Sequence, residues 1–136
     1  MRYCTRTNLH ADRCGSAWLI KRFIDCEAEF TFVDGHTPLP ETVPFDMHGV
    51  EWGHHGNKCT FETIVELNGI TDPIVKQLAA IIHGADIASD SDETLESPGV
   101  QLMFNGMRLI SKDDAEALER GYMLMDALYE GLKRGV

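Results

Sequence analysis

The first 35 residues carry a strand, a helix and a second strand in close succession, and this order constrains the fold more than any other feature. Residues Arg2–Thr7 alternate β-forming and charged side chains, and Glu29–Asp34 is a β-rich run closed by Gly35. Between them, apolar residues recur at helical spacing over about 17–25, with Ser16 as the expected N-cap. A strand, helix and strand of this length predict a compact βαβ unit.

The second half of the chain is predicted to be mainly helical. Helices are expected from Thr60 to about Leu67, from Asp72-Pro73 to about Ala88, from Pro98 onward, and from Ser111 or Asp113 to Lys133–Gly135. The methionines of the last two helices belong to apolar stripes and are expected in the core rather than at a soft-metal site. They are Met103, Met107, Met123 and Met125.

The length and composition indicate one domain. The chain has 136 residues, of which 43% are hydrophobic, and can bury one ordinary core. The predicted fold class is α+β, as a single domain spanning residues 1–136. It has a small N-terminal βαβ-type sheet and a predominantly helical C-terminal half.

A long stretch from His36 to Lys58 lies between the two halves. It holds three of the five prolines and four of the six histidines, which are His36, His48, His54 and His55. We expect a loop with one short strand near Val43–Met47. Long connections inside a compact domain are either functional or disordered, and the histidines favour a functional loop.

Charge excludes two classes of partner. Twelve Lys and Arg residues against 22 Asp and Glu residues give a formal charge of −10, which repels a phosphate backbone and an anionic membrane. We therefore expect no nucleic-acid binding by this chain alone and no membrane association. The start lacks an apolar segment of signal-peptide length, and no window reaches about eighteen consecutive apolar residues, which predicts a cytoplasmic protein. The four cysteines form no CxxC pair and are expected to be reduced thiols.

Two segments supply residues that can bind a metal ion. His83 and Asp86 are three positions apart on a predicted helix, so their side chains project from one face. A glycine turn separates His54 from Glu62, which lies in the first turn of the helix near Thr60, and one imidazole with Glu62 can face His83. Nitrogen and carboxylate ligands suit zinc, iron or manganese. The alternative for His83 is an imidazole hydrogen-bonded to a carboxylate without a metal.

A third group, formed by His10, Asp12 and Arg13, precedes the first predicted helix. Backbone N–H groups at the start of a helix favour anions, and Lys21 and Arg22 add positive charge nearby. Two interpretations are open at this point. Arg13 clamps an oxyanion or carboxylate, or Asp12 forms a salt bridge with an arginine of the loop.

In combination, these segments resemble a known family. The segments are His10-x-Asp12-Arg13, the WLIxRFID run of Trp18–Asp25, the block Cys59–Glu62, and Ile82-His83-x-x-Asp86. In this order, and over nearly the whole chain, they are similar to the C-terminal domain of the ChrB chromate-resistance family. The resemblance implies a role in bacterial chromate resistance. Full-length relatives carry an additional N-terminal region, so we expect this chain to be an isolated module.

The family pattern also selects the expected metal ligands by position. It maps onto His54 rather than His55, and onto Glu62, His83 and Asp86. These four residues are the expected ligands of a divalent metal, which is zinc, iron or manganese. The expected function is a binding module in which this metal helps to recognise a small oxyanion such as chromate. The group of His10, Asp12 and Arg13 is expected to bind that ligand.

Two alternative functions use the same residues differently. In the first, the chain is a small metal-dependent enzyme, hydrolytic or redox, with Glu62 as base or His83 as proton shuttle. In the second, Cys59 or Cys14 reduces chromate through a reactive thiol. The sequence contains no GxSxG, HExxH, P-loop or GxGxxG pattern that would assign an enzyme class. Assembly into a homo-oligomer is left open.

Overall fold

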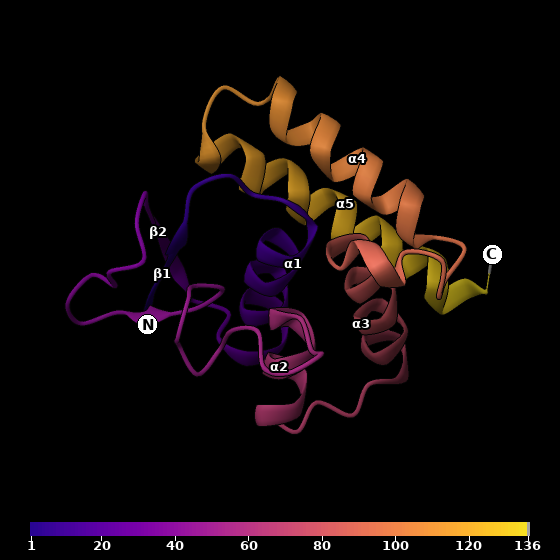
Figure 1. Cartoon of the computed structure of the whole chain (residues 1–136), viewed down its shortest axis with the longest axis horizontal. Helices are drawn as coiled ribbons and strands as arrows, with labels where there is room; N and C mark the ends of the chain where they lie inside the picture. The colour runs from indigo at the N-terminus through magenta and orange to yellow at the C-terminus, as the bar shows by residue number, and fades with distance from the viewer. Residues whose placement is uncertain (136) are drawn as a thin grey trace.

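A three-stranded parallel sheet forms one side of the molecule (Figure 1). The computed structural model describes residues 1–135. The strands are β1 (Arg2–Arg6), β2 (Glu29–Val33) and β3 (Val43–Pro44). Their order is β2-β1-β3, and Tyr3 of the central strand pairs with Phe30 of β2 and Val43 of β3. The predicted βαβ unit is confirmed, and the short strand expected in the long loop is limited to two residues.

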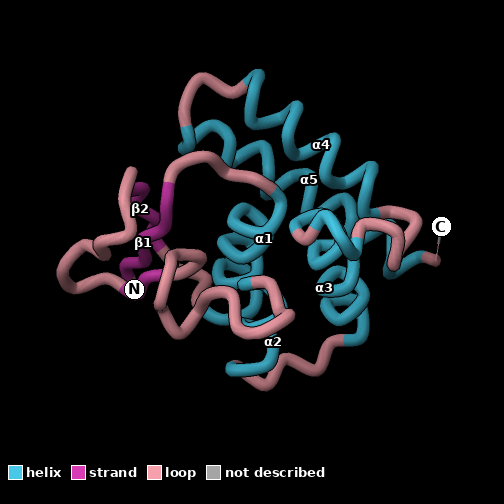
Figure 2. The backbone as a smooth tube through the Cα atoms, viewed as in Figure 1, coloured by secondary structure: helices cyan, strands magenta, loops and turns pink. Residues whose placement is uncertain are grey.

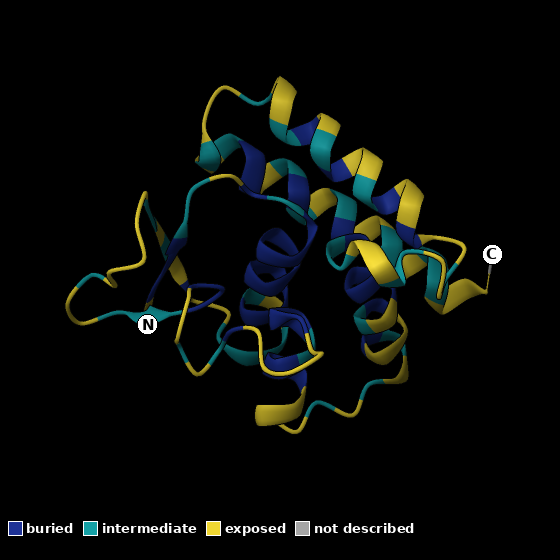
Figure 3. Ribbon diagram, viewed as in Figure 1, coloured by how far each residue is buried: buried dark blue, intermediate teal, exposed yellow. Residues whose placement is uncertain are grey.

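The first helix, α1 (Ala11–Leu19), begins well before the helix expected at 17–25. Every residue of α1 is buried, as its dark blue colour in Figure 3 shows. Its N-cap is His10 rather than Ser16, which lies inside the helix. Because all faces of α1 are buried, its first turns lack the apolar periodicity of a surface helix, and periodicity indicates only the later part. A π-helical turn, η1 (Ile20–Ile24), continues α1 towards β2.

Within residues 1–135, four further α-helices build the larger part of the domain. They are α2 (Thr60–Leu67), α3 (Pro73–Asp86), α4 (Ser97–Ile110) and α5 (Asp114–Arg134), with a short 3₁₀ turn, η2 (Ala88–Asp90), after α3. Helices α2, α3 and α5 pack around α1, and α4 lies outside, mainly against α3 and α5 (Figures 1 and 2). The predicted α+β class with a mainly helical second half is confirmed. Among the described residues, no helix combines the length and the apolar character needed to cross a bilayer.

Local sequence explains where α3 and α5 begin and where α5 ends. Asp72 accepts a hydrogen bond from the Ile74 N–H group at 2.8 Å, and Pro73 occupies the first turn, where no N–H donor is needed. Asp113 caps α5 in the same way. Gly135 ends α5 with a φ of 73°, a left-handed conformation that glycine adopts without strain.

The Trp18–Asp25 segment fastens α1 to α5. Trp18 Nε1 donates to Asp126 Oδ1 at 2.8 Å, and Arg22 Nη1 binds the same carboxylate at 2.7 Å. The Arg22 guanidinium also lies over the Tyr129 ring, 4.3 Å from its centroid. Arg22 was expected to add positive charge near the start of the first helix. Its guanidinium instead contacts α5, at Asp126 and Tyr129.

One face of α4 is apolar and open to solvent. Met103 is 57% exposed and Met123 on α5 is exposed as well, whereas Met107 and Met125 are buried. The expectation that all four methionines lie in the core is therefore wrong for Met103 and Met123. The physical reason is that α3 and α5 cover one side of α4. Nothing within residues 1–135 covers its other side, where Met103 lies, or the side of α5 that carries Met123.

Gly121 on α5 lets α1 approach closely, and its replacement tests the packing. A Cβ atom at Gly121 would overlap Cys14 Sγ, whereas a Cβ atom at Gly131 would meet nothing within 4 Å. We expect Gly121→Ala to lower the free energy of unfolding by about 1–3 kcal/mol through overpacking. Gly131→Ala should raise it by up to about 1 kcal/mol through helix propensity. Urea denaturation measures both changes, and equal stability of the two variants would refute the close contact.

Candidate functional site

The histidine-rich loop between β3 and α2, residues 45–59, is folded against the rest of the domain. Phe45 is fully buried, and its carbonyl oxygen accepts a hydrogen bond from Thr5 Oγ1 at 2.7 Å. The Asp46 N–H group donates to the Trp52 carbonyl at 2.8 Å, which closes the loop onto itself. This loop, drawn in pink in Figure 2, brings His54 to the start of α1 and the end of α3. These contacts hold the loop against the fold, and its functional role stays a prediction.

Three carboxylates converge on one imidazole nitrogen. His54 Nε2 lies 3.1 Å from Asp12 Oδ2 and 3.2 Å from Asp86 Oδ2. Asp46 Oδ1, from the loop, lies 3.7 Å from the same nitrogen. The four residues Asp12, Asp46, His54 and Asp86 form what is termed here the His54 cluster. His10, the N-cap of α1, reaches its edge, with ring nitrogens 3.8 Å from Asp46 and 3.8 Å from Asp86.

Asp12 has a second role at the start of α2. Its carboxylate is completely buried and accepts hydrogen bonds from the Thr60 N–H group at 3.0 Å and the Phe61 N–H group at 2.9 Å. The first N–H groups of a helix have no partner within the helix and favour a negative charge. Asp12 therefore joins α1 to α2 and at the same time presents its charge to His54.

Arg13 is occupied by contacts inside the domain. Its Nη1 atom donates to the carbonyl oxygens of Thr7 at 2.7 Å and Asn8 at 3.0 Å, and its Nη2 atom donates to the Asp46 carbonyl at 3.3 Å. Its Nε atom lies 2.9 Å from Asp46 Oδ2 as an ion pair, without the alignment of a hydrogen bond. These contacts occupy the Arg13 guanidinium, and the salt bridge expected between Asp12 and an arginine is not the one that forms. The partner is Asp46 rather than Asp12.

The His54 cluster favours a positive charge at its centre. Hydrogen bonds to Asp12 and Asp86 raise the pKa of His54 to about 10, against an opposing effect of burial. Burial raises the pKa of Asp12, and the charges of Asp46 and Asp86 add to this increase although the His54 hydrogen bond opposes it. Burial acts to raise the pKa of Asp86, but the His54 hydrogen bond and nearby cationic side chains lower it overall. With this raised pKa, His54 is protonated at neutral pH. Its positive charge then lies among the three carboxylates.

The cluster is open to solvent through a cleft. The His54 side chain is 49% exposed, and a cleft of about 300 Å³ lies beside it. The lining residues include His10, His36, Asp46, His48 and Asp86. The rings of His36 and His48 lie 5.9 Å apart, centroid to centroid. A small ion or molecule can therefore reach His54, Asp46 and Asp86 from the cleft, whereas Asp12 lies behind them.

His83 belongs to a separate group, although it lies on the same helix as Asp86. Its Nδ1 atom lies 2.5 Å from Glu62 Oε1, and its Nε2 atom lies 2.7 Å from Asp90 Oδ2. His83 is only 6% exposed, so both ring nitrogens are enclosed by carboxylates. This geometry is that of the carboxylate-bound imidazole. The structure thus divides the four expected ligands, with His54 and Asp86 in one group and Glu62 and His83 in the other.

The residues Glu62, His83 and Asp90, termed here the His83 bridge, hold three segments together. Glu62 Oε1 accepts a hydrogen bond from the Cys59 N–H group at 3.0 Å and so caps α2, while His83 belongs to α3 and Asp90 to η2. Burial acts to lower the pKa of His83, but the hydrogen bonds of Asp90 and Glu62 raise it overall. The bridge is therefore a charged contact inside the fold, with no ring nitrogen left for a ligand in the cleft.

The buried thiols have the wrong environment for reactivity. Cys14 and Cys59 are fully buried. Burial raises the pKa of Cys14 to about 12, and burial also raises the pKa of Cys59. A reactive cysteine needs exposure and a lowered pKa. The structure therefore opposes reduction of chromate by either residue.

Replacement of His83 tests the bridge and its charge. We expect His83→Gln to lower the free energy of unfolding by about 2–3 kcal/mol at low pH, because charged, buried hydrogen bonds are lost. The folded-state pKa of His83 is raised above 6.5, so its stabilising effect is complete below pH 6.5 and declines as the pH rises through the folded-state pKa. Urea titrations across pH measure the difference between wild type and variant, with the exposed His55→Gln as control. A difference that stays constant or grows above pH 6.5 would contradict a charged His83.

Comparison with known proteins identifies relatives of the chain. Residues 3–132 match the family described as ChrB, C-terminal domain. Protein ChrB from Cupriavidus metallidurans (strain CH34) is 33% identical over 130 residues, which cover 93% of this chain and 39% of that relative. The chain thus spans about two fifths of the length of this curated relative. No solved structure matches the chain. The family match spans all four segments named in the sequence analysis, and the chain belongs to the ChrB C-terminal domain family.

Proposed function

We propose that this chain is a chromate-resistance module that binds one divalent metal ion at the His54 cluster and, through that ion, a small oxyanion such as chromate. Membership of the ChrB C-terminal domain family associates the chain with chromate resistance. The observation that carries the proposal is the convergence of three carboxylates on one imidazole nitrogen of the half-exposed His54 side chain. These carboxylates come from α1, from the histidine-rich loop and from α3.

The charge of the cluster supports a divalent cation. Asp12, Asp46 and Asp86 carry three negative charges when ionised, and Arg13 offsets one of them through its ion pair with Asp46. With a neutral His54, two negative charges are left in a poorly solvated place, where like charges raise each other's free energy. A divalent ion that replaces the His54 proton neutralises them.

The donor atoms suit a first-row metal. One ligand atom each from Asp12, Asp46 and His54 lie within 4.8 Å of one another, and Asp86 Oδ2 lies 3.2 Å from the imidazole nitrogen. A carboxylate has about four acceptor positions, so Asp12 can bind a metal while it holds the first N–H groups of α2. One nitrogen with several carboxylate oxygens is a donor set for zinc, iron or manganese. His10 stands close enough to add a second nitrogen.

The His83 bridge is a weaker candidate for the metal. Ligand atoms of Cys59, Glu62 and His83 also lie within 4.8 Å of one another. A metal there would have to displace two charged hydrogen bonds from a buried ring. The proposal therefore keeps His54 and Asp86 from the ligands expected on sequence grounds. The same geometry gives no support to Glu62 as a general base or to His83 as a proton shuttle.

Oxyanion binding depends on the metal in this proposal. The three carboxylates repel a dianion, and the Arg13 guanidinium is held by backbone carbonyl oxygens. A bound divalent ion reverses the local sign of the charge and accepts an oxygen ligand. The histidines that line the cleft, His10, His36, His48 and His54, can donate hydrogen bonds to that ligand.

Zinc binding tests the metal site. We expect the purified chain to bind one zinc ion in isothermal titration calorimetry. His54→Ala should weaken binding at least ~10-fold, because loss of even an outer-shell partner costs a metal site about that much. His55→Ala is the matched control, since the His55 ring bonds the Glu51 carbonyl at 2.7 Å and does not line the cleft. Circular dichroism checks the fold of each variant. Equal affinities of the two variants, or no binding of zinc, iron or manganese, would sink the proposal.

Chromate binding tests the oxyanion part separately. Zinc has no redox chemistry of its own, so a zinc-loaded chain can be studied with chromate in its oxidised form. In equilibrium dialysis we expect the zinc-loaded wild type to bind chromate. We expect the metal-free protein and the His54→Ala variant not to bind it. Chromate that binds the metal-free protein equally well contradicts the dependence on metal. If the zinc-loaded chain does not bind chromate, the metal site is retained and the oxyanion site is refuted.

A further inference from the structure

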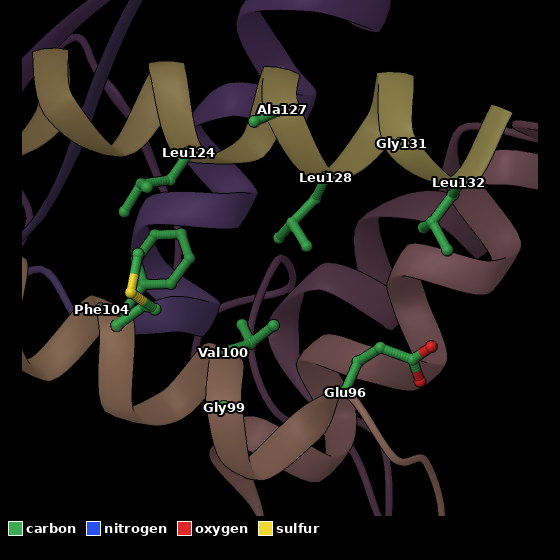
Figure 4. Close-up of a pocket in the computed structure, with 10 residues that line it drawn as sticks. Glu96, Gly99, Val100, Phe104, Leu124, Ala127, Leu128, Gly131 and Leu132 are labelled. Carbon is green, nitrogen blue, oxygen red and sulfur yellow. The ribbon is translucent and has the colours of Figure 1, made fainter. Parts of the chain in front are cut away.

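An apolar groove runs between α4 and α5, and Figure 4 shows the part of it that lies between Phe104 and Leu128. One part, of about 500 Å³, lies between residues that include Phe104 of α4 and Leu128 of α5. A second part, of about 600 Å³, extends towards Ile110. Met103 and Leu124 line both parts, so the two join into one groove along the pair of helices.

An exposed apolar stripe on α4 forms one rim of this groove. Leu102, Leu109 and Ile110 are 74%, 76% and 75% exposed, and Met103 joins them at one edge of the groove. Helix α4 contains no acidic residue, although the chain has 22. Large apolar side chains gathered on one helix face, rather than scattered singly, mark an interaction surface.

We propose that this surface binds a second copy of the chain. Helix α4 of one copy crosses α4 of the other in the antiparallel direction, about a two-fold axis at Met103. An interface of this symmetry requires that one surface be complementary to itself. Each copy meets this requirement, because the projecting stripe and the receiving groove lie next to each other.

The charges at the two ends of the groove fit this arrangement. Glu96 lines one end, near Leu132 in Figure 4, and Arg120 lines the other. Glu96 lies seven residues before Met103, and Arg120 donates to the carbonyl of Ile110, seven residues after Met103, at 3.1 Å. Seven helical residues rise about 10 Å, so both charges lie at similar distances from the two-fold axis.

The axis therefore brings Glu96 of each copy to Arg120 of the other. Two chains that each carry a formal charge of −10 repel one another at long range. The absence of acidic side chains on α4 limits this repulsion at the contact, and the two end pairs favour the antiparallel register.

Sedimentation velocity over a range of concentrations tests the interface. We expect the wild-type chain to dimerise, and Met103→Glu to weaken dimerisation about 30-fold or more, the loss typical of a central interface residue. Leu67→Glu, at an exposed leucine of α2, is the matched control and should dimerise like the wild type. Circular dichroism checks that Met103→Glu is folded, so the test does not depend on zinc binding, and an unchanged zinc affinity further separates this result from the metal proposal. A monomeric wild type, or a Met103→Glu variant that dimerises normally, overturns the proposal.

A charge exchange tests the register. Glu96→Arg and Arg120→Glu should each weaken self-association about 10-fold, because each places like charges together twice in the dimer. A mixture of the two single variants should associate again, since every contact between unlike copies then joins opposite charges. Loss of the Arg120 pair with Glu116 within one copy, at 2.7 Å, cannot produce this recovery. A mixture that stays monomeric would overturn the antiparallel arrangement.

Discussion

The buried carboxylate of Asp12 is the interaction on which both the fold and the candidate site depend. It lies in the first turn of α1, binds the N–H groups of Thr60 and Phe61, and faces His54. Removing a carboxylate from water is costly unless several donors replace the water, and here two backbone donors and an imidazole do so. These contacts fix the start of α2, and the first turn of α2 then carries Glu62 to His83. One residue thus connects the His54 cluster to the His83 bridge.

Local signals predicted the helices of the second half, whereas long-range contacts decided the site. Asp72 and Asp113 cap their helices through bonds to residues nearby in sequence, so their role is visible without a structure. Asp46 has no such signal, because it lies in a loop with a φ of 50° and meets Asp12 only after the chain has folded. The spacing of His83 and Asp86 indicated that both lie on one helix face, but it did not indicate whether they contact the same group. Since α3 ends at Asp86, that carboxylate turns towards α1 while His83 remains against α2.

The segments by which the family is recognised serve the framework as much as the site. The WLIxRFID run binds α1 to α5 through Trp18 and Arg22, and the Cys59–Glu62 block forms the capped start of α2. In the HxDR segment, Arg13 bonds backbone carbonyl oxygens, and Asp12 alone faces the imidazole of His54. Family membership therefore predicts how the helices are held around α1 more directly than it predicts what the cleft binds. The proposed chemistry depends on a few positions within that framework, of which His54 is the most exposed.

The origin of the cluster in distant parts of the chain has a consequence for folding. Asp12 bonds Phe61 across 49 positions, and Asp86 follows at the far end of α3. Closing such long loops costs chain entropy before any contact offsets it, so contacts of this range form slowly compared with the helices themselves. On a growing polypeptide, Asp12 and Asp46 are synthesised before α3, which carries Asp86 at its end. The His54 cluster is therefore complete only after α3 has packed against α1, and a cation that binds it would stabilise that packed arrangement rather than any single segment.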